Sequence, residues 1–478
     1  MGALVGIDVG TTGVKAVAIS PDGQVLALAE GAYELSTPRP GWAEQDPDRW
    51  VVATESALAQ LGVDEIDGIG LSGQMHGLVV LDAADNVLRP AILWNDQRTA
   101  LECAEIEERL GRKRLIELTG NRALTGFTAP KLLWLRHNEP QTYARAEHVL
   151  LPKDYVRLRL TGERVADVTD ASGTLLFDVE HRRWSTEVLD ALELDVAWLP
   201  DAVESQEISG RTSAGVPVAA GAGDQAAGAL GVGVDRPGVL SIAVGTSGVV
   251  FAALPSFVLD EEALLHVFCH SVPRSWHAMG VMLSAAGSLR WLRDALGGEV
   301  GYATLVGEAE AWGPGCEGLT FLPYLAGERT PHADPDARGA FCGLSLRHDR
   351  GALTRAVLEG VAYGLRDSLE LLRSLGVHAE RARVSGGGAR GELWLKIIAS
   401  VLGMPLELTA VEEGAAYGAA LLGGIAGGVY RDASEAVEAA VSVRTVIEPV
   451  EKWRAAYEDG FATFRALYPA LRQVGRPT

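Results

Sequence analysis

Apolar residues recur along the chain with the two periods that distinguish strands from helices. Residues 7–14 give an apolar strand, a Gly-Thr-Thr-Gly turn and a second apolar strand. Residues 14–19 and 24–29 continue as strands, joined by Ser-Pro-Asp-Gly. Turn residues of this kind between apolar runs indicate hairpins. The start of the chain is therefore predicted to be an antiparallel meander rather than a β-α-β unit.

Helical spacing dominates residues 47–61, 100–110 and 353–375. In the last of these, one apolar face is formed by Leu358, Ala362, Leu365, Leu369 and Leu372. Further helices are predicted at 392–402 and, from an Ala/Gly-rich composition that allows close packing, at 414–428. Short strands are predicted at 68–72, 79–81, 216–219, 382–384 and 406–409. This mixture predicts the α/β class.

The hairpin at residues 7–14 is repeated later in the chain. Ile-Asp-Val-Gly-Thr-Thr-Gly-Val at 7–14 returns as Ile-Ala-Val-Gly-Thr-Ser-Gly-Val at 242–249, with six of eight positions identical. The offset of 235 residues is almost half of the 478-residue chain. Because single cores stop growing near roughly 250–300 residues, two lobes are expected on length alone. The sequence therefore predicts a duplicated protein with domains 1–235 and 236–478 and a cleft between them.

Charge narrows the range of partners. Lys and Arg total 42 against 63 Asp and Glu, which gives a formal net charge of −21. A negative field of this size argues against nucleic acid and anionic membranes as the main partners. A small anionic ligand would need a local pocket or a metal ion to receive it.

Cysteine usage and targeting signals predict a cytoplasmic protein. The four cysteines have no CxxC spacing and are too few for a disulfide framework, and the first residues do not resemble a signal peptide. Residues 237–259 carry no charge and are long enough to cross a bilayer. Their central Gly-Thr-Ser-Gly and flanking prolines instead predict two strands and a turn.

The Gly-Thr-Thr-Gly turn is a candidate phosphate site. Successive amides of a tight turn can form an anion-binding nest, and Lys15 lies just beyond it. Asp8 ends the preceding strand and could hold Mg²⁺ directly or through water. For one copy alone, a plain hairpin with a solvated aspartate is the more common structure. The second copy shifts the balance towards phosphate binding, and it differs at the key position, where Ala243 replaces Asp8.

Asp224 follows a strand and a glycine turn at the start of a small-residue helix. Two interpretations are evenly matched there: a helix cap, or a fixed carboxylate that accepts a proton from a substrate hydroxyl. The same stretch fits the loose dinucleotide fingerprint at Gly221, Gly223 and Ala226. That fit is weak, because no acidic residue ends the next strand about 20 residues on.

Three further clusters contain residue types that can bind ligands. The triple-glycine segment at 385–390 would let backbone approach a flat ring or ribose closely, although a simple strand-to-helix turn is commoner. A Walker P-loop is excluded, since the chain has no Gly-Lys pair. Gln74 and His76 sit at a strand–loop junction where they could bind polyol hydroxyls, with Met75 against a carbon face. Zinc is not expected from the histidines at 266–277, because Cys269 would point away from His266 and His270.

Together these segments resemble the FGGY family of carbohydrate kinases. The resemblance runs through nearly the whole chain: GIDVGTTGVKAV, GWAEQDP, LSGQMHG, LWNDQRT, LPKDYVRLRLTG, DASGT, GAGDQAAGALG, VGTSGVV, GVMLSAAGSLRW, GERTPHADPDARGAF and SGGGARGELW. SGQMHG combined with WNDQRT is similar to the branch that phosphorylates xylulose. The resemblance implies a duplicated two-lobe actin/hexokinase-like (ribonuclease H-like) ATPase fold, with sugar and the first phosphate hairpin in 1–235 and the nucleotide in 236–478.

Individual roles follow from the resemblance where the motifs match. Asp224 matches the catalytic base and Asp8 the acidic position linked to Mg²⁺, which is also counted as catalytic. Sugar contacts are implied for Gln74, Met75, His76, Asp224 and Gln225. Nucleotide contacts are implied for Thr11, Thr12, Lys15, Gly245, Thr246, Gly387 and Gly388. Trp42, Asn95, Asp96 and Arg98 fall in family motifs near the sugar side without an individual role, and Glu392 departs from the small polar residue of some relatives.

The expected activity is ATP-dependent phosphorylation of a ketopentose, D-xylulose to D-xylulose 5-phosphate. The expected cofactors are ATP and Mg²⁺, and the expected partners are a small-molecule sugar and ATP–Mg, with a homodimer left open. Kinases for another ketose, a polyol or a sugar acid are the nearest alternatives. A non-catalytic sugar sensor would be expected to have lost Asp8 or Asp224, and a nicotinamide-dependent dehydrogenase rests only on the weak fingerprint.

Overall fold

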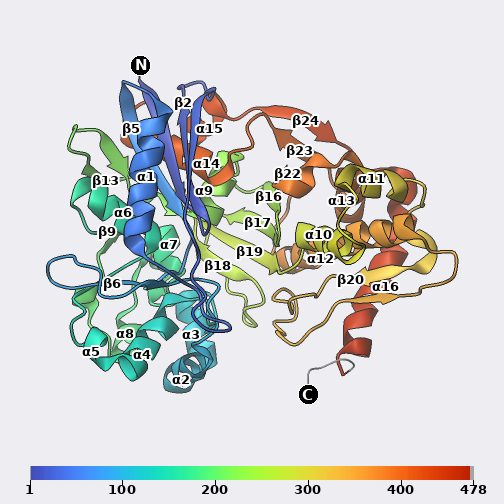
Figure 1. Ribbon diagram of the computed structural model, residues 1–478, viewed down its shortest axis with the longest axis horizontal. Coiled ribbons are helices and arrows are strands. Elements are labelled where there is room, and N and C mark those ends of the chain that lie inside the picture. Colours follow the sequence, from blue (N-terminus) through green and yellow to red (C-terminus); the bar gives the residue numbers. More distant parts are fainter. Residues whose placement is uncertain (1, 474–478) are drawn as a thin grey trace.

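Two seven-stranded mixed sheets organise the molecule, seen in a computed structural model that describes residues 2–473 (Figure 1). The first sheet has the order β13-β14-β5-β1-β2-β3, with β15 paired to β5. Its strands are β1 (Ala3–Val9), β2 (Gly13–Ile19), β3 (Val25–Ala32), β5 (Ile66–Gly73), β13 (Ile208–Arg211), β14 (Pro217–Ala219) and β15 (Ala222–Gly223). The predicted opening meander is confirmed, because β1, β2 and β3 pair antiparallel in sequence order.

The second sheet has the order β18-β19-β17-β16-β22-β23-β24. Its strands are β16 (Val239–Val244), β17 (Gly248–Leu254), β18 (His266–Cys269), β19 (Trp276–Met282), β22 (Arg381–Ser385), β23 (Leu406–Thr409) and β24 (Val443–Ile447). The uncharged stretch at 237–259 thus forms β16 and β17, as predicted. Within residues 2–473, no helix is long and apolar enough to cross a membrane.

The two sheets share one pattern at their centres. In the first, β1 pairs antiparallel with β2 and parallel with β5. In the second, β16 pairs antiparallel with β17 and parallel with β22. The repeated hairpin therefore stands at the same place in both sheets, which confirms the duplicated two-lobe α/β fold.

Helices cover both faces of the first sheet. On one face, α1 (Pro47–Leu61) and α6 (Pro152–Thr161) pack over the strands around fully buried Trp50. On the other face lie α9 (Asp224–Gly231), α14 (Gly414–Ala426) and α15 (Ala433–Ala440). The approach of α14 is so close that a Cβ on Gly70 would lie 1.8 Å from the Ala419 carbonyl oxygen. The close-packed helix predicted at 414–428 is confirmed, and it comes late in the chain yet lies on the first sheet.

The second sheet is covered mainly by α12 (Arg350–Ser374), α13 (Glu392–Leu402), α10 (Ala286–Ala295), α11 (Tyr302–Ala309) and α16 (Arg454–Leu471). All five residues of the apolar face predicted for 353–375 are buried in this core. The helix starts three residues earlier than predicted because Asp349 caps it, accepting a hydrogen bond from the Ala352 N–H at 3.0 Å. Helices α1 and α13 have the predicted bounds.

A subdomain from the first half of the chain lies below the first sheet (Figure 1). Its helices are α2 (Ala100–Leu110), α3 (Arg112–Thr119), α4 (Thr128–Asn138), α5 (Pro140–Tyr143), α7 (Val168–Ser172) and α8 (Thr186–Leu192). Short strand pairs complete it: β4 (Glu44–Gln45) with β7 (Ala91–Ile92), β6 (Val79–Leu81) with β8 (His148–Leu150), β9 (Val165–Asp167) with β12 (Asp201–Val203), and β10 (Phe177–Asp178) with β11 (Arg183–Trp184). In the second half, β20 (Thr320–Leu322) pairs with β21 (Ala340–Cys342).

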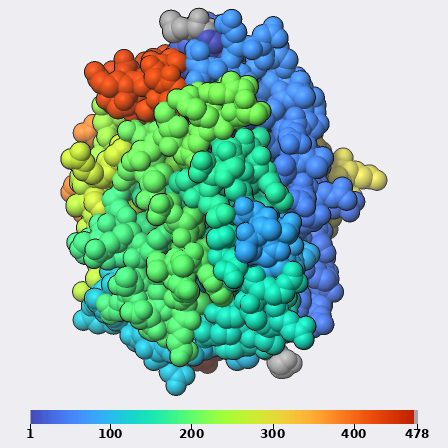
Figure 2. Space-filling model, turned by 90° about the vertical axis from the view of Figure 1, so that its left-hand side faces the viewer, coloured from blue at the N-terminus to red at the C-terminus, as the bar shows by residue number. Residues whose placement is uncertain are grey.

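This subdomain joins the two lobes. Its core includes Met75 and Phe127 together with Phe251, Phe268 and Met279 from the second sheet. Figure 2 shows the outer side of the first lobe and its subdomain, formed mainly by green and blue segments of the first 235 residues. A red segment from late in the chain lies at the upper left of this view. A shared core places residues of both lobes around one cleft.

Candidate active site

The cleft between the lobes brings together the two aspartates singled out in the sequence. A pocket of about 210 Å³ is lined by Asp8 and Asp224 from the first half. Its other walls come from α9, from the second sheet and from the start of α14: Gln225, Gly228, Ala229, Ser241, Ala243, Val249, Phe251, Ser385, Gly414 and Ala415. The duplicate positions Asp8 and Ala243 thus line the same space.

Strand register explains this convergence. Asp8 stands opposite Ser72 in the parallel pair β1–β5, and β15 pairs with the same stretch of β5, Gly223 opposite Gly73. The carboxyl ends of β1, β5 and β15 therefore meet at one edge of the sheet. The first hairpin, the loop after Gly73 and Asp224 all emerge at this edge, which is where open α/β sheets bind ligands.

Asp224 is the first residue of α9, and Gly223 occupies the N-cap position without a side-chain capping bond. Asp224 is therefore not the N-cap residue of α9. Burial, with a smaller contribution from the charge of Asp8, raises the pKa of Asp224 to about 7, while hydrogen bonds from Gln225 oppose the rise. A carboxylate that titrates near neutrality in a cleft suits a general base.

Asp8 has the character of a metal-linked carboxylate. Its Oδ1 is buried without a hydrogen-bond partner. Burial raises the pKa of Asp8, while the nearby Ser72 hydroxyl and the charge of Lys15 oppose that rise. Among the described residues, no group of three or more His, Cys, Asp or Glu side chains is arranged as a metal cage. The donor set fits Mg²⁺, which proteins usually hold through one or two carboxylates with substrate phosphates and water.

The first hairpin is held by side chains from beneath. The buried Gln74 donates hydrogen bonds to the Gly10 carbonyl and to Gln45 Oε1, both at 3.2 Å. Its Oε1 accepts a bond from the Thr11 hydroxyl at 3.4 Å, and Trp94 Nε1 donates to Thr11 Oγ1 at 2.9 Å. Gln74, proposed as a sugar contact, thus has its amide engaged with the hairpin. Thr12 at the tip is exposed.

Lys15, another candidate for phosphate binding, forms an ion pair with a residue from the second half of the chain. Its Nζ lies 2.9 Å from Glu413 Oε2, just before α14, and 3.3 Å from Glu30 Oε1. The side chain is 39% exposed, so the pair stays in contact with solvent. A phosphate at Lys15 would have to compete with Glu413.

The second hairpin is held by backbone alone. The N–H groups of Ala285 and Gly287 donate to the Thr246 carbonyl at 2.8 and 3.2 Å, and the Ala286 N–H donates to the Gly245 carbonyl at 2.8 Å. The exposed Thr246 stands at the tip. These bonds dock the hairpin on the start of α10.

The triple-glycine segment packs beside the second hairpin. Gly386 has a φ of 88°, and a Cβ there would lie 2.8 Å from the Val244 carbonyl oxygen. A Cβ on Gly388 would lie 2.4 Å from Val244 Cγ1. Only glycine fits so close to the end of β16. Gly387, between these two glycines, is exposed, and no atom of a described residue other than its chain neighbours lies within 4 Å of the position that its Cβ would take. Gly245, Thr246, Gly387 and Gly388 thus gather at neighbouring strand ends, since Ala243 pairs with Ser385.

Met75 packs against the residue before Asp224, and His76 follows Met75 in the loop after β5. Met75 is 5% exposed, and a Cβ on Gly223 would lie 2.7 Å from its Cγ. His76 adopts a φ of 68°, and its Nδ1 lies 2.6 Å from the Gly173 carbonyl oxygen. Burial lowers the pKa of His76 to about 3, so the ring is neutral and Nδ1 carries the hydrogen that this carbonyl accepts. Nε2 is then left as an acceptor for a hydroxyl.

The family-motif residues without an assigned role form one network near the first hairpin. Arg98 makes a bidentate pair with the buried Asp96, and its guanidinium stacks 3.5 Å from the centre of the Trp42 ring. Asn95 Oδ1 is buried without a partner. Sequence reasoning missed Trp94, whose signal was its place beside Asn95 in LWNDQRT. It also missed Thr169, which immediately precedes the DASGT segment and accepts a hydrogen bond from the Gly223 N–H.

Comparison with known proteins places the chain. The N-terminal domain of the FGGY family of carbohydrate kinases matches residues 3–231, and the C-terminal domain of that family matches residues 240–427. The chain belongs to the FGGY family of carbohydrate kinases. Membership in this family removes the dehydrogenase alternative.

Relatives match over the whole length. The xylulose kinase of Escherichia coli (strain K12) is 42% identical, over 98% of this chain and 99% of that protein. A crystal structure of a xyloylose kinase from Brucella ovis superposes with a TM-score of 0.93 at 43% identity, covering 98% of this chain and 99% of the other. Gluconate kinase from Lactobacillus acidophilus also reaches 0.93, at 26% identity over 99% and 98% of the chains.

Proposed function

We propose that this carbohydrate kinase transfers the γ-phosphoryl group of ATP to D-xylulose, giving D-xylulose 5-phosphate. The observation that carries the chemistry is the position of Asp224, a buried carboxylate with a pKa near 7 in the cleft between the two hairpins. The sugar is supported by full-length identity of 42% to a xylulose kinase. Fold likeness alone does not choose the sugar, because a gluconate kinase superposes equally well.

Asp224 acts as the general base in this proposal. Its carboxylate accepts the proton of the C5 hydroxyl as that oxygen attacks the γ-phosphorus. Deprotonation near pH 7 makes the group available at neutral pH. Met75, packed against Gly223, and the neutral His76 bind the sugar beside it, and Gln225 lines the same pocket.

Charge on the phosphates is offset mainly without basic side chains. Asp8, through its free Oδ1, would hold Mg²⁺, which when bound neutralises charge on the β- and γ-phosphates. The amides of Thr11 and Thr12 in one hairpin, and of Gly245 and Thr246 in the other, donate to phosphate oxygens. Gly387 and Gly388 leave room for the nucleoside. This arrangement suits a chain of net charge −21, since no Lys or Arg is among the described residues that line the pocket of Asp8 and Asp224.

The test is an ADP-release assay with xylulose, ribulose, arabitol, gluconate and glycerol as acceptors. We expect kcat/KM to be highest for xylulose, and Asp224→Asn to reduce turnover by roughly 10²–10⁴-fold, the usual contribution of a positioned acid–base group. Asp46→Asn, at the exposed N-cap of α1, is the matched control and should keep full turnover. A higher kcat/KM for another acceptor would overturn the sugar assignment. An Asp224→Asn variant with more than about a tenth of wild-type turnover would overturn the mechanism.

A further inference from the structure

Helix α7, short and buried, is bonded to the backbone that leads into Asp224. The Gly223 N–H donates a hydrogen bond to Thr169 Oγ1 at 2.8 Å. Gly223 pairs with β5 and immediately precedes Asp224. The next residue after α7, Gly173, carries the carbonyl that His76 contacts. One five-residue helix therefore touches the supports of both the proposed base and the proposed sugar ligand.

The hydroxyl of Thr169 has a fixed orientation. It donates to Asp167 Oδ2 at 2.6 Å, and the Thr169 N–H donates to the same oxygen at 2.7 Å. The Ser205 hydroxyl adds a third bond to this oxygen at 3.1 Å. Because its hydrogen is used by Asp167, the Thr169 oxygen presents a lone pair to the Gly223 N–H. Thr169 and Asp167 are both fully buried.

Behind Asp167 lies a buried ion cluster centred on Lys153. Lys153 Nζ is 2.6 Å from Asp154 Oδ1, 2.7 Å from Asp167 Oδ1 and 3.1 Å from Asp170 Oδ2. Burial disfavours the charge on Lys153, but these three carboxylates together hold its pKa above the ordinary value. Burial raises the pKa of Asp170 well above its usual range. Lys153 is therefore positively charged, and its ion pair holds the carboxylate of Asp167 in place.

The same cluster holds the other end of the segment before Asp224. Arg157 lies 2.9 Å from Asp154 Oδ1 and donates to the Ala220 carbonyl at 2.7 Å. Residues 220–223 are therefore fastened at both ends by one group of charges. Between them Gly221 has a φ of 81°, and a Cβ there would lie 2.1 Å from the Leu71 carbonyl oxygen.

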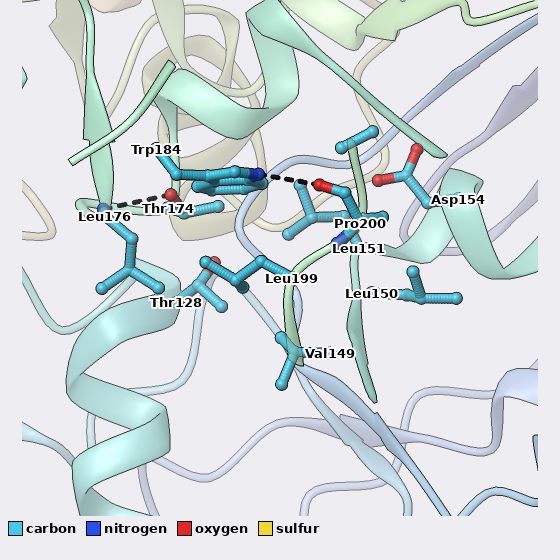
Figure 3. A pocket seen from close by; sticks show the side chains of 11 residues that line it. Thr128, Val149, Leu150, Leu151, Asp154, Thr174, Leu176, Trp184, Leu199 and Pro200 are labelled. Carbon is cyan, nitrogen blue, oxygen red and sulfur yellow. Dashed lines mark hydrogen bonds between the residues drawn. The ribbon is translucent and has the colours of Figure 1, made fainter. Parts of the chain in front are cut away.

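No ligand is needed to explain this cluster. The pocket beside it has a volume of only about 10 Å³, room for one water molecule. Figure 3 shows that pocket, with Trp184, Leu151 and Leu199 around it and Asp154 at its edge. Buried ion pairs are often no more stabilising than apolar residues of similar volume. Orientation of the backbone before Asp224 is what the charges provide and apolar packing would not.

We propose that Thr169 is a positioning residue that, held by Asp167 and Lys153, aims the carboxylate of Asp224 into the cleft. The proposal rests on the assignment of Asp224 as the base. Loss of the Thr169 hydroxyl frees the Gly223 N–H and lets the start of α9 shift. A displacement of about 1 Å at a reacting group can reduce turnover by up to 10²-fold.

Thr169→Val tests the proposal, with Thr169→Ser as the conservative rescue and Thr174→Val as the matched control. Thr174 is also buried near α7 and loses two local bonds, from its hydroxyl to the Ala171 carbonyl and from the Leu176 N–H (Figure 3). We expect Thr169→Val to lower kcat by about tenfold or more with an unchanged KM for ATP. Thr169→Ser and Thr174→Val should stay within about twofold of wild type. Equal losses in Thr169→Val and Thr174→Val would overturn the proposal.

A double-mutant cycle with Asp224→Asn separates positioning from general destabilisation. If Thr169 acts through Asp224, Thr169→Val should change the residual turnover of Asp224→Asn by less than about twofold. A full tenfold loss in both backgrounds would make Thr169 a structural residue and leave the base assignment intact. Failure of Asp224→Asn to reduce turnover would instead contradict the proposed function. Should Thr169→Val not fold, Ser205→Ala loosens Asp167 from outside and should lower kcat by about threefold in the wild-type background only.

Discussion

The two copies of the hairpin have closely similar sequences and the same place in their sheets, but their surroundings differ. The first, between β1 and β2, carries Asp8 and rests on the buried side chains of Gln74 and Gln45. The second, between β16 and β17, has Ala243 at the equivalent position and is docked by three backbone N–H groups at the start of α10. The two copies thus share the glycine- and hydroxyl-rich turn, and only the first has a carboxylate at this position.

That difference sets the charge of the cleft. Asp8 and Asp224 line the same pocket, and the charge of Asp8 contributes to the raised pKa of Asp224. A third carboxylate at Ala243 would repel both of them and the phosphates. In the proposed function, the second hairpin therefore contributes donors without charge, whereas the first contributes donors and the carboxylate that would hold Mg²⁺.

Asp8→Asn makes the first hairpin resemble the second in charge while keeping its shape. We expect turnover to fall by roughly 100-fold and the Mg²⁺ concentration for half-maximal activity to rise, because the carboxylate that would hold the ion is gone. Sugar affinity, measured by quenching of tryptophan fluorescence without ATP, should change little. Ala243→Asn, a neutral change in the same cleft, is the control. Collapsed sugar affinity with an unchanged response to Mg²⁺ would refute the metal role of Asp8.

Ala243→Asp makes the second hairpin resemble the first. The added charge faces Asp8, Asp224 and the bound phosphates in one pocket, so we expect the KM for ATP to rise by roughly tenfold. The KM for the sugar should change less. Ala243→Asn again separates charge from size, and equal effects of the two substitutions would show that bulk rather than charge matters at this position.

Local sequence was enough to predict the parts of the fold that depend on local chemistry. Turn residues located both hairpins, and apolar periodicity located α1, α2, α12 and α13. The placement of α14 on the first sheet was not foreseen, because it depends on glycines in β1 and β5 that meet its backbone. Such a contact joins residues about 350 positions apart and leaves no periodic signal.

The sequence predicted part of the candidate site and missed the contacts that depend on tertiary packing. Residue type and motif indicated Asp8 and Asp224, which the cleft brings together. Lys15 was proposed as a phosphate ligand because it follows the turn, but its partner Glu413 comes from the other half of the chain. Thr169 gave no signal, since a five-residue helix is too short for an amphipathic pattern and its bond to Gly223 is set by tertiary packing.

Stability gives the smallest effect and tests the charge of the cleft without any turnover. The pKa of Asp224 is raised from an ordinary value near 3.8 to about 7 in the folded protein. As pH rises from about 4 to 7, the unfolded chain releases this proton first, so the folded state loses stability over that window.

Asp224→Asn removes the titrating carboxyl group from this position. We expect its melting temperature, measured without metal or nucleotide, to equal that of the wild type at pH 4.5 and to exceed it by a few degrees at pH 8. Asp46→Asn, at an exposed cap, should show no such divergence. A difference that is the same at both pH values would mean that the cleft does not raise the pKa of Asp224, and the contrast between a charged and an uncharged hairpin would lose its energetic basis.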